Sequence, residues 1–176
     1  VIHMMEPHLD YAPPADIRGT FTPISPPFHV PLSDRVLSEG LKSGEIMIPR
    51  DIPLITGIYD EEILTADRAV GTLRAGLEAR GQPTLTIITA DHGEEFWDHG
   101  GFEHGHTLYG ELTHTPLIMT GPGIPTGTVR TVVGHRDLFR ALITASGAEL
   151  PANVGGTDLL DIAQKGAWAG ERTVVS

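Results

Sequence analysis

The residues most able to do chemistry in this chain stand together in one short sequence, Asp91-His92-Gly93-Glu94. A carboxylate oxygen beside an imidazole nitrogen is a donor pair that divalent cations accept, and glycine lets the backbone turn tightly after it. Two adjacent ligands are too few to hold a metal. The sequence therefore predicts at most half of a cation site, and an ordinary turn explains Asp-His-Gly equally well.

Further histidines add to what this region could do. His99, His104 and His106 each stand next to a glycine, and His8 lies far upstream in a segment with several prolines. Glycine beside histidine lets backbone and imidazole approach a small anion together, and an imidazole can donate a proton to a departing oxygen. A solvated loop with its own hydrogen-bond network fits the same pattern, so the residues alone leave both interpretations open.

The elements that must position these residues can be predicted on either side of the loop. Apolar side chains recur at spacings of three and four over 58–80, and Gly81 follows, which predicts a helix with a glycine at its end. Residues 84–90 are apolar and β-branched, which predicts a central strand. Asp91 then stands at the carboxyl end of a strand, where open α/β sheets bind ligands.

Helix and strand signals continue after the loop. A second strand is predicted at 116–120, a glycine-proline turn at 121–127 and a short strand at 128–133. Asp137 can cap a helix that ends at Gly147. This order of elements favours an α/β fold, a sandwich with a largely parallel central sheet.

Proline breaks up the region that precedes these elements. We interpret 12–53 as a loop-rich, proline-containing insertion or flap within one partial domain that covers 1–176. Residues 1–5 and 172–176 both look like strand segments. The chain is therefore expected to begin and end inside a domain.

Composition excludes several classes of protein. The 176 residues carry 12 Lys and Arg against 23 Asp and Glu, a net charge of −11, with no basic patch, so a nucleic acid is not expected as a partner. No apolar run is long enough to predict a membrane-spanning segment, and no leader peptide is recognised, so the compartment stays unassigned. The absence of cysteine excludes a disulfide or a cysteine nucleophile within the chain.

Six motifs, taken in order, resemble those of the sulfatase family of the alkaline phosphatase superfamily. They are residues 6–14, residues 59–63 with Asp67 and Gly71, residues 89–94, residues 104–109, residues 116–118, and Pro122-Gly123 with Asp137-Leu138. The resemblance spans nearly the whole chain. It implies an alkaline-phosphatase-like α/β/α sandwich, here incomplete, and hydrolysis of sulfate esters of small molecules or glycans.

The resemblance also implies roles for single residues. Asp91 and His92 match half of the ligand set for one divalent cation, expected to be calcium, with magnesium, manganese or zinc as alternatives. His8 matches a histidine that contacts the transferred sulfuryl group, and His104 matches a residue that protonates the leaving oxygen. His99 and His106 are expected on the substrate side. A bound cation would also offset the repulsion between an acidic chain and an anionic ester.

The main departure from the family concerns the nucleophile. Sulfatases carry Cys or Ser in Cys/Ser-x-Pro-x-Arg near the start of the domain, and neither Ser25 nor Ser33 lies in that pattern. The aspartates that complete the metal site are missing too, so a further N-terminal part of the domain is the expected partner of this chain. Alone, the chain is expected to be inactive or a weak metal binder.

Other functions remain open at this point. A phosphoester or phosphonate hydrolase, or a phosphoglycerol transferase of the same superfamily, shares the Asp-His-Gly and His-Gly motifs. A two-zinc phosphodiesterase is disfavoured because residues 6–8 do not supply its second metal pair. A noncatalytic sulfatase-like binding module is a third possibility, although such a module has no need for His8, Asp91, His92 and His104 together.

Overall fold

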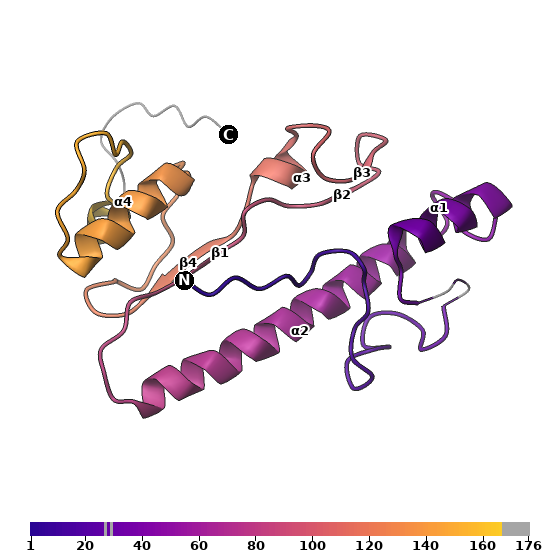
Figure 1. Ribbon diagram of the computed structural model, residues 1–176, viewed down its shortest axis with the longest axis horizontal. Helices are drawn as coiled ribbons and strands as arrows, with labels where there is room; N and C mark the ends of the chain where they lie inside the picture. The colour runs from indigo at the N-terminus through magenta and orange to yellow at the C-terminus, as the bar shows by residue number, and fades with distance from the viewer. Residues whose placement is uncertain (27, 29, 167–176) are drawn as a thin grey trace. The chain divides into compact units, whose positions relative to one another are not determined.

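The computed structural model describes residues 1–26, 28 and 30–166, and these residues divide into two compact units. Unit 1 comprises Val1–Gln82 and Glu95–Glu103, and unit 2 comprises Pro83–Glu94 and the described residues from His104 onward. Figure 1 shows the elements of both units. No helix among the described residues is long and apolar enough to span a bilayer.

Unit 1 is built on one long helix, α2, which covers Ile52–Ala79 (Figure 1). The predicted helix over 58–80 is therefore confirmed, and it starts a turn and a half earlier because Pro53 fits the first turn of a helix, where no N–H partner is needed. Only the first half of α2 packs into the apolar core of unit 1, through Ile55 and Ile58.

The proline-rich region contains a helix that the sequence did not predict. Helix α1 covers Asp34–Ser43, begins where the Ser33 hydroxyl accepts the Val36 N–H, and ends at Gly44 with φ of 79°. Leu37 on this helix joins the core of unit 1. The interpretation of 12–53 as an insertion or flap stays a prediction.

A short hairpin also belongs to unit 1. Strands β2 (Glu95–Phe96) and β3 (Phe102–Glu103) pair antiparallel, within a region that the sequence predicted to be loop. Aromatic rings hold the hairpin, because Phe102 lies edge-on to Phe96 with centroids 5.8 Å apart and stacks on Trp97 at 4.6 Å. Each strand is only two residues long, so the alternation of side chains that predicts a strand could not be recognised in the sequence.

Unit 2 holds the second pair of strands. Strands β1 (Thr86–Thr89) and β4 (Leu117–Thr120) confirm two predicted strands and pair antiparallel, with Thr86 opposite Thr120. Gly121 follows with φ of 140°, and a Cβ there would lie 2.5 Å from the Thr84 carbonyl oxygen, so this close approach needs glycine.

Three helices complete the described part of unit 2. They are α3 (Gly110–Thr113), α4 (His135–Ser146) and α5 (Leu159–Lys165). Helix α4 confirms the predicted helix and packs against α5 through a small core of Ala141, Leu159 and Ile162. Asp137 opens α4, since its carboxylate accepts the Gly134 N–H at 2.9 Å and the Thr157 N–H at 2.6 Å.

Two expected strand segments differ from the structure. Residues 128–133 form no strand, because Val132 is 64% exposed and the described residues offer them no partner strand; residues 1–5 are likewise irregular. The predicted strand at 172–176 lies outside the described residues. The chain thus combines helices and strands as expected, but the sheets described here are two-stranded and antiparallel.

Candidate functional site

Strand β1 delivers the Asp-His-Gly-Glu sequence to the surface of unit 2. The strand ends at Thr89, and the Ala90 carbonyl oxygen lies 2.9 Å from His135 Nε2 at the start of α4. Asp91 follows with its side chain 77% exposed, and its Oδ1 accepts the backbone N–H of His92 at 3.1 Å. A helix end therefore anchors the chain just before the first candidate ligand.

The imidazole of His92 is set for coordination through one nitrogen. Its Nδ1 lies 2.9 Å from the Gly93 carbonyl oxygen, which can only accept, so Nδ1 carries the proton and Nε2 keeps its lone pair. Histidines that bind metals commonly donate their other N–H in this way. Nε2 is 3.9 Å from Asp91 Oδ1, close enough for both atoms to bind one cation. The donor chemistry therefore fits a divalent ion.

Gly93 is needed because another backbone segment presses against it. Its N–H donates to the Leu112 carbonyl at 2.8 Å, and a Cβ at this position would lie 1.9 Å from the carbonyl oxygen of Glu111. Helix α3 thus fixes the turn after His92 through backbone contacts that no larger residue permits.

A buried carboxylate orients the predicted proton donor. Glu94 has a side chain only 6% exposed, and its Oε1 lies 3.0 Å from His104 Nδ1. The His104 ring also lies against His92, with centroids 4.0 Å apart and planes at 31°. Sequence reasoning gave Glu94 no role. The available signal was an acidic residue directly after Asp-His-Gly, followed by a histidine-rich loop.

The remaining predicted residues lie in both units. Within unit 2, His106 Nδ1 is 3.4 Å from the His104 carbonyl oxygen. In unit 1, the His8 backbone N–H donates to Met5, and His99 sits at the exposed tip of the β2–β3 hairpin. The structure therefore brings Asp91, His92, His104 and His106 together within unit 2.

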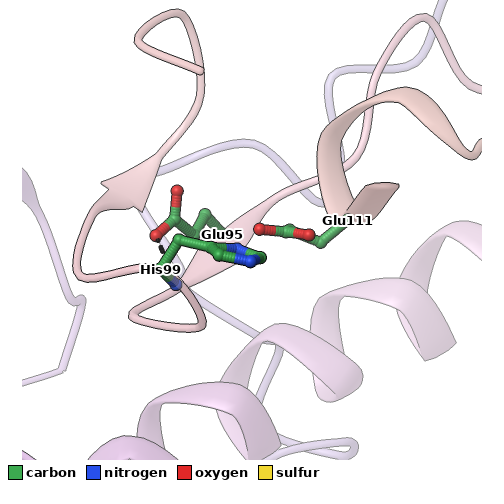
Figure 2. A group of neighbouring side chains, drawn as sticks. All are labelled: Glu95, His99 and Glu111. Carbon is green, nitrogen blue, oxygen red and sulfur yellow. Dashed lines mark hydrogen bonds between the residues drawn. The ribbon is translucent and has the colours of Figure 1, made fainter. Parts of the chain in front are cut away.

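Figure 2 shows how the His99 loop is held. The fully buried Glu95 carboxylate accepts the His99 backbone N–H at 3.0 Å (Figure 2). It also accepts the Gly101 N–H at 2.7 Å. Glu95 was likewise missed from sequence. Its contacts organise the hairpin turn that carries His99.

Two carboxylates of unit 1 have shifted pKa values. The pKa of Asp51 is lowered, mainly by hydrogen bonds from the Arg50 guanidinium and further by the Met47 N–H. The pKa of Glu62 is raised, mainly because the side chain is buried, although the Ala12 N–H donates to it. Both carboxylates lie in α2 or in the proline-rich region beside it, so we assign them a role in the stability of unit 1 and none in the candidate site.

Comparison with known proteins identifies the family. A sequence model described as Sulfatase matches residues 1–148. The chain belongs to the sulfatase family. It is 36% identical over 122 residues to arylsulfatase K of Canis lupus familiaris, an alignment that covers 68% of this chain and 23% of that protein. Identity to human arylsulfatase K is 35% over 119 residues, covering 66% and 22%.

A bacterial sulfatase is similar over a shorter stretch. Delta 4,5-hexuronate-2-O-sulfatase of Bacteroides thetaiotaomicron is 32% identical over 85 residues, covering 45% of this chain and 17% of that protein. No solved structure matches the chain. The chain spans less than a quarter of the length of these sulfatase relatives. Membership of the sulfatase family suggests that a divalent metal ion is bound.

Proposed function

We propose that this chain forms part of a metal-dependent sulfatase that cleaves sulfate esters, a sulfuric ester hydrolase. The observation that carries the proposal is the joint placement of Asp91, His92 and His104 in unit 2, at the end of β1. Family membership supports the same activity. We also propose that β1 and β4 belong to a larger, largely parallel sheet of an α/β/α sandwich in the complete domain.

The proposed metal ligands are Asp91 Oδ1 and His92 Nε2. A bound divalent ion, calcium first and magnesium, manganese or zinc as alternatives, would polarise the nonbridging oxygens of the ester. Asp91 contributes charge and His92 contributes a nitrogen whose orientation the Gly93 carbonyl fixes. Two ligands leave most of the coordination sphere to residues outside this chain.

The histidines take the proton-transfer and substrate roles in the proposal. His104 as imidazolium donates its Nε2 proton to the leaving oxygen as the sulfur–oxygen bond breaks. The sulfuryl group passes to the nucleophile of the completing segment, which forms the new bond to sulfur. His8 contacts the sulfuryl group, and His99 and His106 line the substrate side. The names of the relatives suggest aryl sulfates and sulfated uronates as the first substrates to test.

The test is to join the chain to the nucleophile-bearing segment of a sulfatase domain and measure ester hydrolysis. We expect 4-nitrophenyl sulfate to be cleaved faster than 4-nitrophenyl phosphate, with activity lost in EDTA and restored by calcium. Preference for phosphate would favour the phosphoester alternative. Failure to cleave either ester with calcium, magnesium, manganese or zinc would refute the catalytic proposal and favour a binding module.

Metal binding by the chain itself tests the half-site separately. Calorimetry with calcium or manganese should show binding no tighter than millimolar, because only two ligands are supplied. Tight binding would mean that the ligand set closes within these residues, contrary to the proposal.

A further inference from the structure

We propose that Glu94 is a positioning residue that holds His104 in the orientation needed to protonate the leaving group. The inference rests on the proposed sulfatase function, but it concerns a residue to which that function assigns no role. It follows from the contact between a carboxylate that is almost fully buried and one particular nitrogen of the imidazole.

The geometry selects one tautomer of His104. Glu94 Oε1 lies 3.0 Å from Nδ1, and an ionised carboxylate can only accept a hydrogen bond. Nδ1 therefore keeps its proton, and Nε2 is the nitrogen that exchanges protons with a substrate. When imidazolium gives up its Nε2 proton, the neutral form left behind is the one that Glu94 already binds.

Burial makes this contact stronger than a surface pair. With its side chain 6% exposed, Glu94 has little water around it, so the charge needs a protein partner and the Nδ1 contact has a high local strength. The His92 ring packs against the His104 ring with centroids 4.0 Å apart, and this contact limits rotation of His104. Orientation is thus fixed from two sides.

One tetrapeptide then carries two functions. Asp91 and His92 supply the candidate metal ligands. Glu94 lies two residues after His92, beyond the Gly93 turn that α3 holds in place, and it orients the proton donor His104. A displacement of this tetrapeptide would move the ligands and the proton donor together. This arrangement explains why a buried acid follows Asp-His-Gly directly.

The tautomer can be measured without any activity. In 15N NMR of the chain at alkaline pH, His104 should be the Nδ1–H tautomer in the wild type and in Glu94→Gln, whose amide oxygen still accepts. In Glu94→Ala it should shift towards the Nε2–H form that free imidazole side chains prefer. An Nε2–H signal in the wild type would overturn the proposal, even if the alanine variant fails to fold.

The second test measures enzymatic activity after the chain has been joined to the nucleophile-bearing segment of a sulfatase domain. We call this joined protein the nucleophile-completed protein. Glu94→Gln, which keeps the acceptor, should retain most of the activity. Glu94→Ala should lower kcat by about 10–100-fold for an alkyl sulfate, whose leaving oxygen needs a proton, with KM little changed. It should have little effect on 4-nitrophenyl sulfate, whose leaving group needs none. The matched control is Glu149→Ala, which makes the same truncation at an exposed residue of unit 2.

The outcomes separate the two proposals. If the wild-type protein cleaves neither ester, the sulfatase proposal fails while the NMR result still decides the orientation of His104. If the wild type is active and Glu94→Ala slows both substrates equally, Glu94 has only a structural role and the inference is overturned.

Discussion

Carboxylates serve different purposes in the two units. Glu61 on α2 is fully buried, and its Oε1 accepts N–H groups from Gly19, Phe21 and Thr22 at 3.0–3.1 Å and the Thr22 hydroxyl at 2.8 Å. Asp91 in unit 2 is 77% exposed, with its Oδ1 turned to its own neighbour. A carboxylate surrounded by backbone donors holds distant segments of the chain together, whereas an exposed one can be reached by a ligand.

Charge alone therefore does not mark a functional site. The acidic pair of α2, Glu61 and Glu62, was part of the motif that resembled sulfatases, and in the structure both residues bind backbone of the proline-rich region. The contacts bridge about forty to fifty positions of sequence. Substitutions in the two units should therefore affect different properties.

Loss of Asp91 should have the largest effect, and it should fall on activity. In the nucleophile-completed protein, Asp91→Ala should reduce sulfate-ester hydrolysis by more than ~100-fold. Loss of a residue that is only hydrogen-bonded to a metal ligand can cost that much, and this variant removes a proposed ligand itself. Its thermal midpoint should hardly move. Sulfate release and thermal unfolding measure the two properties.

The control for Asp91 is Asp161→Ala, which removes a partly exposed aspartate paired with Lys165 on α5. Activity should stay near wild type in this variant. Equal loss in both variants, or a large fall in the midpoint of Asp91→Ala, would mean that Asp91 also serves structure and would remove the contrast between the units.

Loss of Glu61 should instead destabilise unit 1. Glu61→Ala leaves four donors without their acceptor, and we expect the free energy of unfolding to fall by about 3 kcal/mol. Glu78→Ala on the same helix, where the side chain is exposed, is the matched control. Urea denaturation compares them, and similar losses in both variants would contradict the role of Glu61 as an anchor.

The pH dependence of stability should separate two carboxylates within unit 1. The lowered pKa of Asp51 means that its stabilisation is present above the unfolded-state pKa and is lost as pH falls through the folded one. The raised pKa of Glu62 acts oppositely, so stability declines as pH rises from the unfolded-state pKa through the folded one.

Variants test the two signs. Asp51→Asn should flatten the acid side of the stability curve, and Glu62→Gln should remove the decline on its higher-pH side. Urea midpoints measured between about pH 3 and pH 8 report both changes. A Glu62→Gln curve parallel to that of wild type would show that burial does not shift this carboxyl.

The smallest effect is expected at an exposed ion pair of unit 1. Arg68 Nη1 lies 2.6 Å from Asp16 Oδ2, with both side chains at least half exposed. Arg68→Ala should change the free energy of unfolding by less than about 0.5 kcal/mol, because solvent screens the pair. A loss approaching that of Glu61→Ala would show that charge, not burial, anchors the proline-rich region.

Local patterns predicted much of the fold. The apolar spacing of α2 and α4 and the β-branched run of β1 were sufficient, because each depends on a single segment. Helix α1 was hidden by the surrounding prolines, and the β2–β3 hairpin by its glycines and histidines. The antiparallel pairing of β1 with β4 depends on the path of the residues that connect the two strands, and the hydrophobic pattern within each strand does not predict that path.

The candidate site divides in the same way. Asp91 and His92 could be proposed from their position after a strand, since neighbours in sequence need no fold to bring them together. The contact between Glu94 and His104 depends on the path of the loop between them, including the hairpin. Its partners were visible in sequence, but their pairing was not.

The tight turn at Gly93 has a consequence for how substitutions would be tolerated. In a mutational library selected only for folded protein, Gly93 should be nearly invariant because any side chain meets the Glu111 carbonyl oxygen, whereas Asp91 should vary widely. In a library selected for catalysis, both positions should be fixed. Sequence invariance at neighbouring positions would then have two separate origins, steric at Gly93 and chemical at Asp91.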